Sequence, residues 1–257
     1  MKSTIKAASL GSLLTACGQL AHKYRIFAPT SEDEVTGFRP LDQMTPQQRQ
    51  DIGPIAFANK PTVGSIKSFF FPDSEVYIKF TRQGRHVEQE EQEAMSPQII
   101  LGAKPCDIKS IELIDKVFLA EPVDSLYQEK RGKTIIIATT CSEPGQNCTC
   151  REFGISPVAS SADLVMLQGS QDEVSLTAQS AKGEQLLREL LPLGSFTVDD
   201  PSPLPLGGPY ARQLSSEQIQ SRMDELFNSP LWDKLALTCL GCGTCTFYCP
   251  TCHCFDI

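Results

Sequence analysis

Apolar positions along the chain follow two different periods, and together they predict a mixed fold. Short, continuous apolar runs at residues 98–101 and 134–140 are typical of strands that are buried on both faces. Between them, residues 107–119 carry apolar side chains at helical spacing, and residues 124–130 predict a second helical piece. A strand–helix–strand unit of this kind is parallel and right-handed almost without exception. We therefore expect an α/β (mixed α+β) fold.

The flanking segments predict further elements. Leucines at helical spacing indicate a first helix near residues 10–20, which would bury Cys17, although residues 14–17 also resemble a lipoprotein cleavage box. Residues 30–66 contain several prolines and are expected to form loops, whereas residues 75–80 alternate and predict a half-buried strand. The remaining expected elements are strands at 24–28, 163–167 and 173–178, helices at 184–191, 215–227 and 231–237, and a solvated acidic loop at 88–93.

Eleven cysteines set this sequence apart from an ordinary globular chain. In the C-terminal group, which begins at Cys239, the first four cysteines are separated by two, two and three residues and are followed by Pro250. This is the spacing with which bacterial ferredoxins bind a [4Fe–4S] cluster through thiolates. The candidate cluster ligands are Cys239, Cys242, Cys245 and Cys249, with Cys252 and Cys254 as further candidates.

Zinc is the competing interpretation of the same segment. Two Cys-x-x-Cys pairs, Cys239/Cys242 and Cys249/Cys252, could hold a structural zinc ion. The pairs lie closer together than the roughly 15–20 residues usual between pairs of this kind, and zinc leaves Cys245 without a role. We therefore expect at least one [4Fe–4S] cluster, with a zinc-stabilised assembly module that has no redox role as the alternative.

A second group of cysteines follows the two buried strands. Cys106 comes shortly after residues 98–101, and Cys141 comes directly after residues 134–140. If these strands are parallel neighbours, both thiols emerge at the carboxyl edge of the sheet, where open α/β sheets bind their ligands. The candidate metal ligands of this second cluster site are Cys106, Cys141, Cys148 and Cys150.

Positive charge near this second group favours an anionic ligand. Lys104 and Arg151 would offset the negative charge of a cluster held by thiolates. Two other interpretations remain open. The thiols could be separate or form a disulfide, or a cysteine with a low pKa could carry out thiol–disulfide chemistry.

The motifs together resemble those of a known family. The matching segments are residues 24–29, 67–72, 102–107, 141–150 and 239–256. In these segments the chain resembles the iron–sulfur beta subunit of soluble hydrogenases of the sulfhydrogenase type, and the A subunit of anaerobic sulfite reductase. The resemblance implies a non-catalytic electron-transfer subunit. Its partners would be a flavin subunit that exchanges electrons with NAD(P)H and a catalytic redox subunit of the hydrogenase or sulfite/sulfur reductase type.

The resemblance also implies how the C-terminal cysteines are used. Cys239, Cys242 and Cys245 would hold one [4Fe–4S] cluster, and Cys249 would belong to a second. Family members continue to another cysteine motif, whereas this sequence stops at Ile257. We expect a truncated or split chain, ligands from a partner, or a fourth ligand taken from Cys249, Cys252 or Cys254.

Composition and charge exclude several function classes. The net charge of −8 and a pI of about 5.0 argue against a general nucleic-acid binder, which needs a basic surface. No apolar run approaches the ~20 residues of a membrane span, and no glycine-rich nucleotide motif is present. The three histidines, His22, His86 and His253, are scattered and form no triad pattern. We expect a cytoplasmic protein.

Three parts of the chain differ in composition. Residues 1–200 are expected to form the α/β domain with the second cysteine site. Residues 201–214 are rich in proline and glycine and read as a linker. Residues 215–257 are expected to form a short helical segment that resembles an incomplete ferredoxin.

Overall fold

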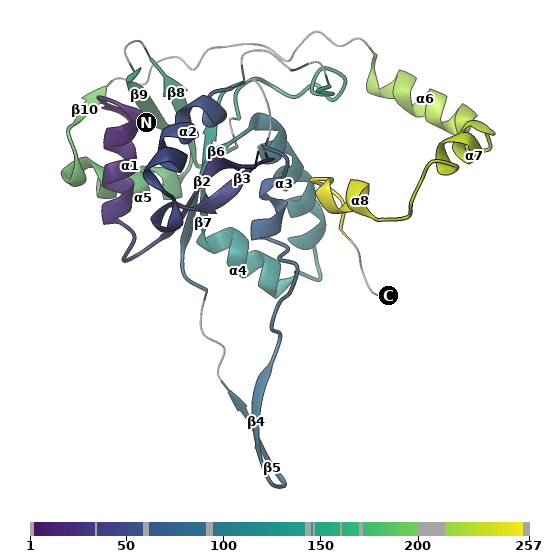
Figure 1. Ribbon diagram of the computed structural model, residues 1–257, viewed down its shortest axis with the longest axis horizontal. Coiled ribbons are helices and arrows are strands. Elements are labelled where there is room, and N and C mark those ends of the chain that lie inside the picture. Colours follow the sequence, from purple (N-terminus) through teal and green to yellow (C-terminus); the bar gives the residue numbers. More distant parts are fainter. Residues whose placement is uncertain are drawn as a thin grey trace.

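An eight-stranded mixed sheet forms the centre of the computed structural model (Figure 1). In sheet order, the strands are β10 (Phe196–Asp199), β1 (Thr4–Ala7), β9 (Val174–Ala178), β8 (Leu164–Gln168), β7 (Thr134–Thr139), β6 (Gln98–Ala103), β2 (Arg25–Glu32) and β3 (Val35–Pro40). The structure describes residues 3–33, 35–58, 62–90, 95–141, 145, 147–159, 161–169, 172–199 and 214–253. With helices packed on this sheet, the expectation of an α/β fold is confirmed.

Four parallel strands, β2, β6, β7 and β8, occupy adjacent positions in the sheet, and antiparallel strands extend it on both sides. Successive residues of β6 enter different cores, with Ile99 in one hydrophobic cluster and Ile100 in the other. Ile135 and Ile136 of β7 alternate in the same way. The continuous apolar runs therefore mark strands that are covered on both faces, as the sequence predicts.

Helices cover the sheet on both faces. The first core is completed by α1 (Leu10–Gln19), α2 (Pro46–Ala56) and α5 (Ala181–Leu190). The second is completed by α3 (Pro105–Phe118), α4 (Ser125–Lys133) and the short 3₁₀ helix η2 (Ile66–Phe69). In α1, Cys17 is fully buried, as expected. The helices α3 and α4 connect the parallel neighbours β6 and β7, so the predicted strand–helix–strand unit is confirmed.

Two expectations for the segment between residues 30 and 90 are wrong. The supposed loop region contains β3 and α2, and α2 begins with a capping box between Thr45 and Gln48. The strand expected at 75–80 is not half-buried, because Val76, Ile78 and Phe80 are 56%, 59% and 65% exposed. Instead, β4 (Lys79–Gln83) and β5 (His86–Glu90) pair as a separate hairpin that projects from the body (Figure 1). Part of the expected acidic loop therefore lies in β5.

The C-terminal part of the chain forms three short helices, α6 (Ser216–Leu226), α7 (Leu231–Ala236) and α8 (Thr244–Tyr248). Ser215 caps α6 through the capping box that the sequence predicts. Of the expected linker at 201–214, all but Leu214 falls outside the described residues, and the three domain boundaries stay predictions. Within the described ranges, no helix is long and apolar enough to cross a membrane.

Candidate metal centres

The second cysteine site starts at the carboxyl edge of the paired strands β6 and β7. Gly102 near the end of β6 has a φ of +89°, and an added Cβ there would lie 3.0 Å from the Pro29 ring. Glycine therefore allows β6 to bend next to β2 before α3 begins. Cys106 lies in the first turn of α3, and Cys141 follows β7. The two thiols thus emerge at the same edge of the sheet, as predicted.

The four upstream thiols interact with one another. Cys150 shares hydrogen bonds with Cys106 and Cys148, and Cys148 also interacts electrostatically with Cys141. The hydrogen bond to Cys150 and burial raise the pKa of Cys106, whereas the same bond lowers the pKa of Cys150 to about 7. Cys150 therefore ionises more readily than Cys106 or Cys148, because Cys106 stabilises its thiolate.

Lys104 supplies a buried positive charge beside these thiols. Its Nζ donates hydrogen bonds to the carbonyl oxygens of Ala56 and Ala58, at 2.6 and 2.5 Å. Burial lowers the pKa of Lys104, while Cys141 and Cys106 act on it electrostatically in the opposite direction. Lys104 therefore lies where the sequence expects a cation that offsets thiolate charge.

The residue types at this site fit a metal ion or cluster, but their arrangement does not form a ligand set. No group of three or more Cys, His, Asp or Glu side chains in the described parts of the chain is arranged to hold a metal ion. The ten described cysteines are all free of disulfides. Thiolates are the ligands that iron–sulfur clusters and structural zinc use, so the donor set fits such a group.

The C-terminal loop has the backbone that closely spaced thiolate ligands need. Gly241 and Gly243 adopt left-handed conformations, with φ values of +68° and +71°. The Gly241 N–H donates to the Sγ of Cys239 at 3.4 Å, and Cys242 shares a hydrogen bond with Thr244. N–H groups directed at cysteine sulfur tune the reduction potential of iron–sulfur clusters. The thiols of Cys239, Cys242 and Cys245 belong to exposed residues.

Cys249 and Cys252 form a separate, partly buried pair. Burial opposes ionisation of Cys249, but hydrogen bonds with Cys252 and Thr251 lower its pKa to about 7. The hydrogen bond with Cys249 raises the pKa of Cys252, and the charge of Lys67 opposes that shift. The structure thus brings these two thiols together and leaves Cys239 outside the pair. Cys254 lies outside the described residues.

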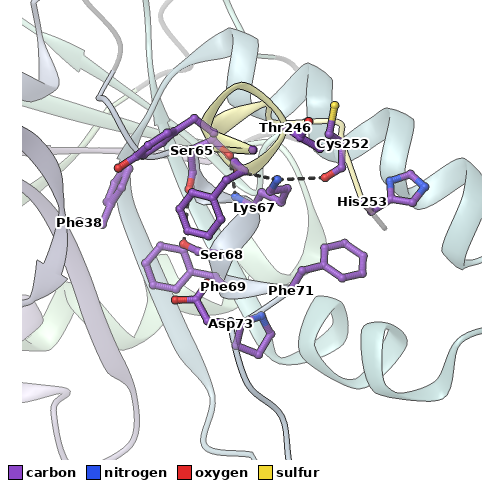
Figure 2. A pocket seen from close by; sticks show the side chains of 15 residues that line it. Phe38, Ser65, Lys67, Ser68, Phe69, Phe71, Asp73, Thr246, Cys252 and His253 are labelled. Carbon is purple, nitrogen blue, oxygen red and sulfur yellow. Dashed lines mark hydrogen bonds between the residues drawn. The ribbon is translucent and has the colours of Figure 1, made fainter. Parts of the chain in front are cut away.

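The side chain of Lys67 holds the C-terminal segment against the sheet domain. Lys67 of η2 donates hydrogen bonds to the carbonyl oxygens of Phe247, Cys249 and Cys252, at 2.9, 2.8 and 2.9 Å. Figure 2 shows Lys67 reaching the C-terminal segment beside His253. The residues at this junction line a cavity of about 1060 Å³.

The sequence alone predicts no role for Lys67, and it leaves His253 as a possible ligand alongside Cys252 and Cys254. Lys67 belongs to the matching segment 67–72, and His253 stands between two cysteines. Those positions are the sequence features that could have pointed to these two residues. The contacts themselves join residues that lie 180 or more positions apart along the chain.

Comparison with known proteins extends the resemblance to most of the chain. No family model matches it. The chain is 27% identical over 243 residues to the sulfhydrogenase 2 subunit beta of Pyrococcus furiosus, covering 91% of this chain and 67% of that protein. The resemblance to hydrogenase beta subunits is confirmed by this match, whereas the resemblance to anaerobic sulfite reductase stays a prediction.

Proposed function

We propose, from the similarity of this chain to a sulfhydrogenase beta subunit, that it is an iron–sulfur electron-transfer subunit of a redox complex. The Cys239–Cys249 loop carries the proposal. Its cysteine spacing is that of a ferredoxin, and two left-handed glycines and an N–H···S hydrogen bond supply the matching backbone. Zinc requires no such run of three closely spaced thiols.

The residues of the chain would hold the cluster and set its surroundings. Cys239, Cys242 and Cys245 would be three ligands of a [4Fe–4S] cluster, which accepts and releases single electrons. Cys249, Cys252 and Cys254 supply the remaining candidate ligands. Deprotonated thiolates bind iron, so the pKa of about 7 for Cys249 favours its use near neutral pH.

The upstream cysteines would form a second cluster site. Cys106 and Cys141 lie at one sheet edge, and hydrogen bonds and electrostatic interactions connect these thiols with Cys148 and Cys150. Lys104 would partly neutralise a cluster there, and a nearby cation raises the potential of an anionic cluster. Two sites in one chain would let electrons pass through the subunit.

The proposed partners are a flavin subunit that uses NAD(P)H and a catalytic subunit, in a cytoplasmic complex. Large apolar side chains beside the cysteine loop support assembly, since Leu237 and Leu240 are 86% and 93% exposed. We also propose the division into a domain at 1–200, a linker at 201–214 and a ferredoxin-like segment at 215–257.

A second candidate function is thiol chemistry at the upstream site. Cys150 has a pKa of about 7 and lies next to two other thiols. A thiolate with a neighbouring thiol is the arrangement that thiol–disulfide exchange uses. This function needs Cys150 to be accessible rather than bound to iron.

Cysteine variants distinguish these proposals. We expect anaerobically purified Cys239→Ser protein to lose iron from the C-terminal site, and Cys106→Ser protein to lose iron from the upstream site. Cys17→Ser serves as the control, because Cys17 is buried in the core and is not a candidate ligand. Iron retained in full by both ligand variants would reject both cluster assignments. A Cys106→Ser variant that loses no iron, in protein that alkylates rapidly at Cys150, would favour thiol chemistry at that site.

A further inference from the structure

We infer that Lys67 is a positioning residue that fixes the Cys249–Cys252 turn on the sheet domain. The inference rests on the proposed function where it concerns a cluster, but the docking itself concerns only residues of this chain. It assigns to a lysine on η2, far away in sequence, the task of placing two candidate cluster ligands.

The hydrogen bonds of Lys67 account for its whole donor capacity. A lysine ammonium has three N–H donors and no acceptor. Each donor reaches one main-chain carbonyl, of Phe247, Cys249 or Cys252. Because all three acceptors lie in one short stretch of backbone, the side chain holds the turn at three points rather than at one.

The end of α8 presents main-chain carbonyls to the Lys67 ammonium. Phe247 lies in the last turn of α8, and Cys249 is its C-terminal cap. The last carbonyl oxygens of a helix find no N–H donor within the helix and carry partial negative charge, so a cation there is favourable. The Cys252 N–H donates to the Cys249 carbonyl at 3.3 Å, which closes the turn that Lys67 holds.

His253 provides a second point of attachment. Its ring stacks against Phe71 with centroids 6.3 Å apart, and it meets Phe118 of α3 edge-on at 4.9 Å. Figure 2 shows His253 and Phe71 near Lys67. The turn is therefore held by the hydrogen bonds of Lys67 up to Cys252 and by aromatic packing of the next residue, His253.

The position of Lys67 has an electrostatic consequence for any cluster bound by this turn. The Nζ of Lys67 lies 2.8 and 2.9 Å from the carbonyl oxygens of Cys249 and Cys252, two of the candidate ligands. Reduction adds negative charge to a cluster, so a nearby cation stabilises the reduced form and raises the reduction potential. Loss of Lys67 should therefore both loosen the turn and make that potential more negative.

The first test uses the full chain without metal, so that it does not depend on cluster assembly. Hydrogen exchange of the 245–253 peptide is measured in the wild type, Lys67→Met, Lys67→Arg and Lys116→Met, the last being a control on an exposed lysine of α3. We expect amide exchange to be about tenfold faster in Lys67→Met. Without the three hydrogen bonds from the lysine to the carbonyls, the turn should open more often and expose its amides. Lys67→Arg should restore part of the protection, and Lys116→Met should match the wild type. Equal exchange in Lys67→Met and the wild type would overturn the inference.

The second test uses the iron-loaded chain and an electrochemical measurement. An EPR-monitored redox titration should give a more negative midpoint potential in Lys67→Met than in the wild type, with Lys67→Arg close to the wild type. An unchanged potential in Lys67→Met would overturn the electrostatic part. A wild-type chain that binds no iron, but whose turn loosens in Lys67→Met, would reject the proposed function and leave the docking role standing.

Discussion

The environment of each cysteine decides how readily it ionises. Burial raises the pKa of Cys17 to about 12, whereas a hydrogen bond from Cys106 lowers that of Cys150 to about 7. The same functional group is therefore an apolar core side chain in α1 and a readily ionised thiol at Cys150. Helical spacing of the leucines was enough to predict the burial of Cys17. The hydrogen bond between Cys106 and Cys150 depends on the loop conformation, which no local pattern specifies.

We predict that Cys17 makes stability fall at alkaline pH. Its pKa is raised on folding, from 9.0 to about 12, so its contribution is complete below pH 9 and is lost as the pH rises towards 12. By pH 11 the loss should be about 2–3 kcal/mol. Urea unfolding at pH 8 and pH 11 should show that the wild type loses this much more stability than Cys17→Ala. The same loss in both proteins would contradict the prediction.

We predict that Cys106 sets the reactivity of Cys150. In metal-free protein, alkylation of Cys150 should be half-maximal near pH 7, because Cys106 stabilises its thiolate. The Cys106→Ala variant removes that hydrogen bond and should move the midpoint upward, towards the ordinary thiol range. Mass spectrometry after brief iodoacetamide treatment gives the site-specific rates. Cys242→Ala is the control and should leave the alkylation midpoint of Cys150 unchanged. If the midpoint also stays unchanged in Cys106→Ala, the coupling between Cys106 and Cys150 is ruled out.

Elements with strong periodicity were predictable, and those whose sequence signals conflict were not. The runs in β6 and β7 and the apolar face of α3 each agree with their burial. The helix α2 was not predicted because it contains Pro54 and its first half, residues 47–51, is entirely polar, although Thr45 and Pro46 mark its start. Residues 75–80 alternate like a half-buried strand, but alternation does not specify whether a partner layer exists.

We predict that the contact between α5 and the start of β8 permits only glycine at position 183. A Cβ added to Gly183 would lie 2.1 Å from the Asp163 carbonyl oxygen. Gly183→Ala should therefore lower the free energy of unfolding by about 2–4 kcal/mol. At Gly132, in α4, an added Cβ meets nothing within 4 Å. Gly132→Ala should therefore be neutral or stabilising by up to about 1 kcal/mol. Equal stabilities of the two variants in urea unfolding would contradict this account.

Apart from the buried Cys17, the described cysteines lie in two groups, one at the carboxyl edge of the sheet and one in the C-terminal segment. Parallel pairing of β6 and β7 was predictable, and it brings Cys106 and Cys141 to one edge. The docking of the C-terminal turn by Lys67 was not predictable, because it joins residues that are distant in sequence and acts on main-chain atoms. The sequence identifies the candidate thiols, whose roles stay predictions, whereas the pairing of Cys249 with Cys252 is visible only in the structure.

Iron, zinc and acid-labile sulfide per chain, measured on protein purified without oxygen, test the central claim most directly. The account predicts iron matched by sulfide, with a brown absorbance that dithionite bleaches. About four irons would correspond to one [4Fe–4S] cluster, and about eight would include the upstream site. Zinc without sulfide would contradict the electron-transfer proposal and identify a structural module in its place.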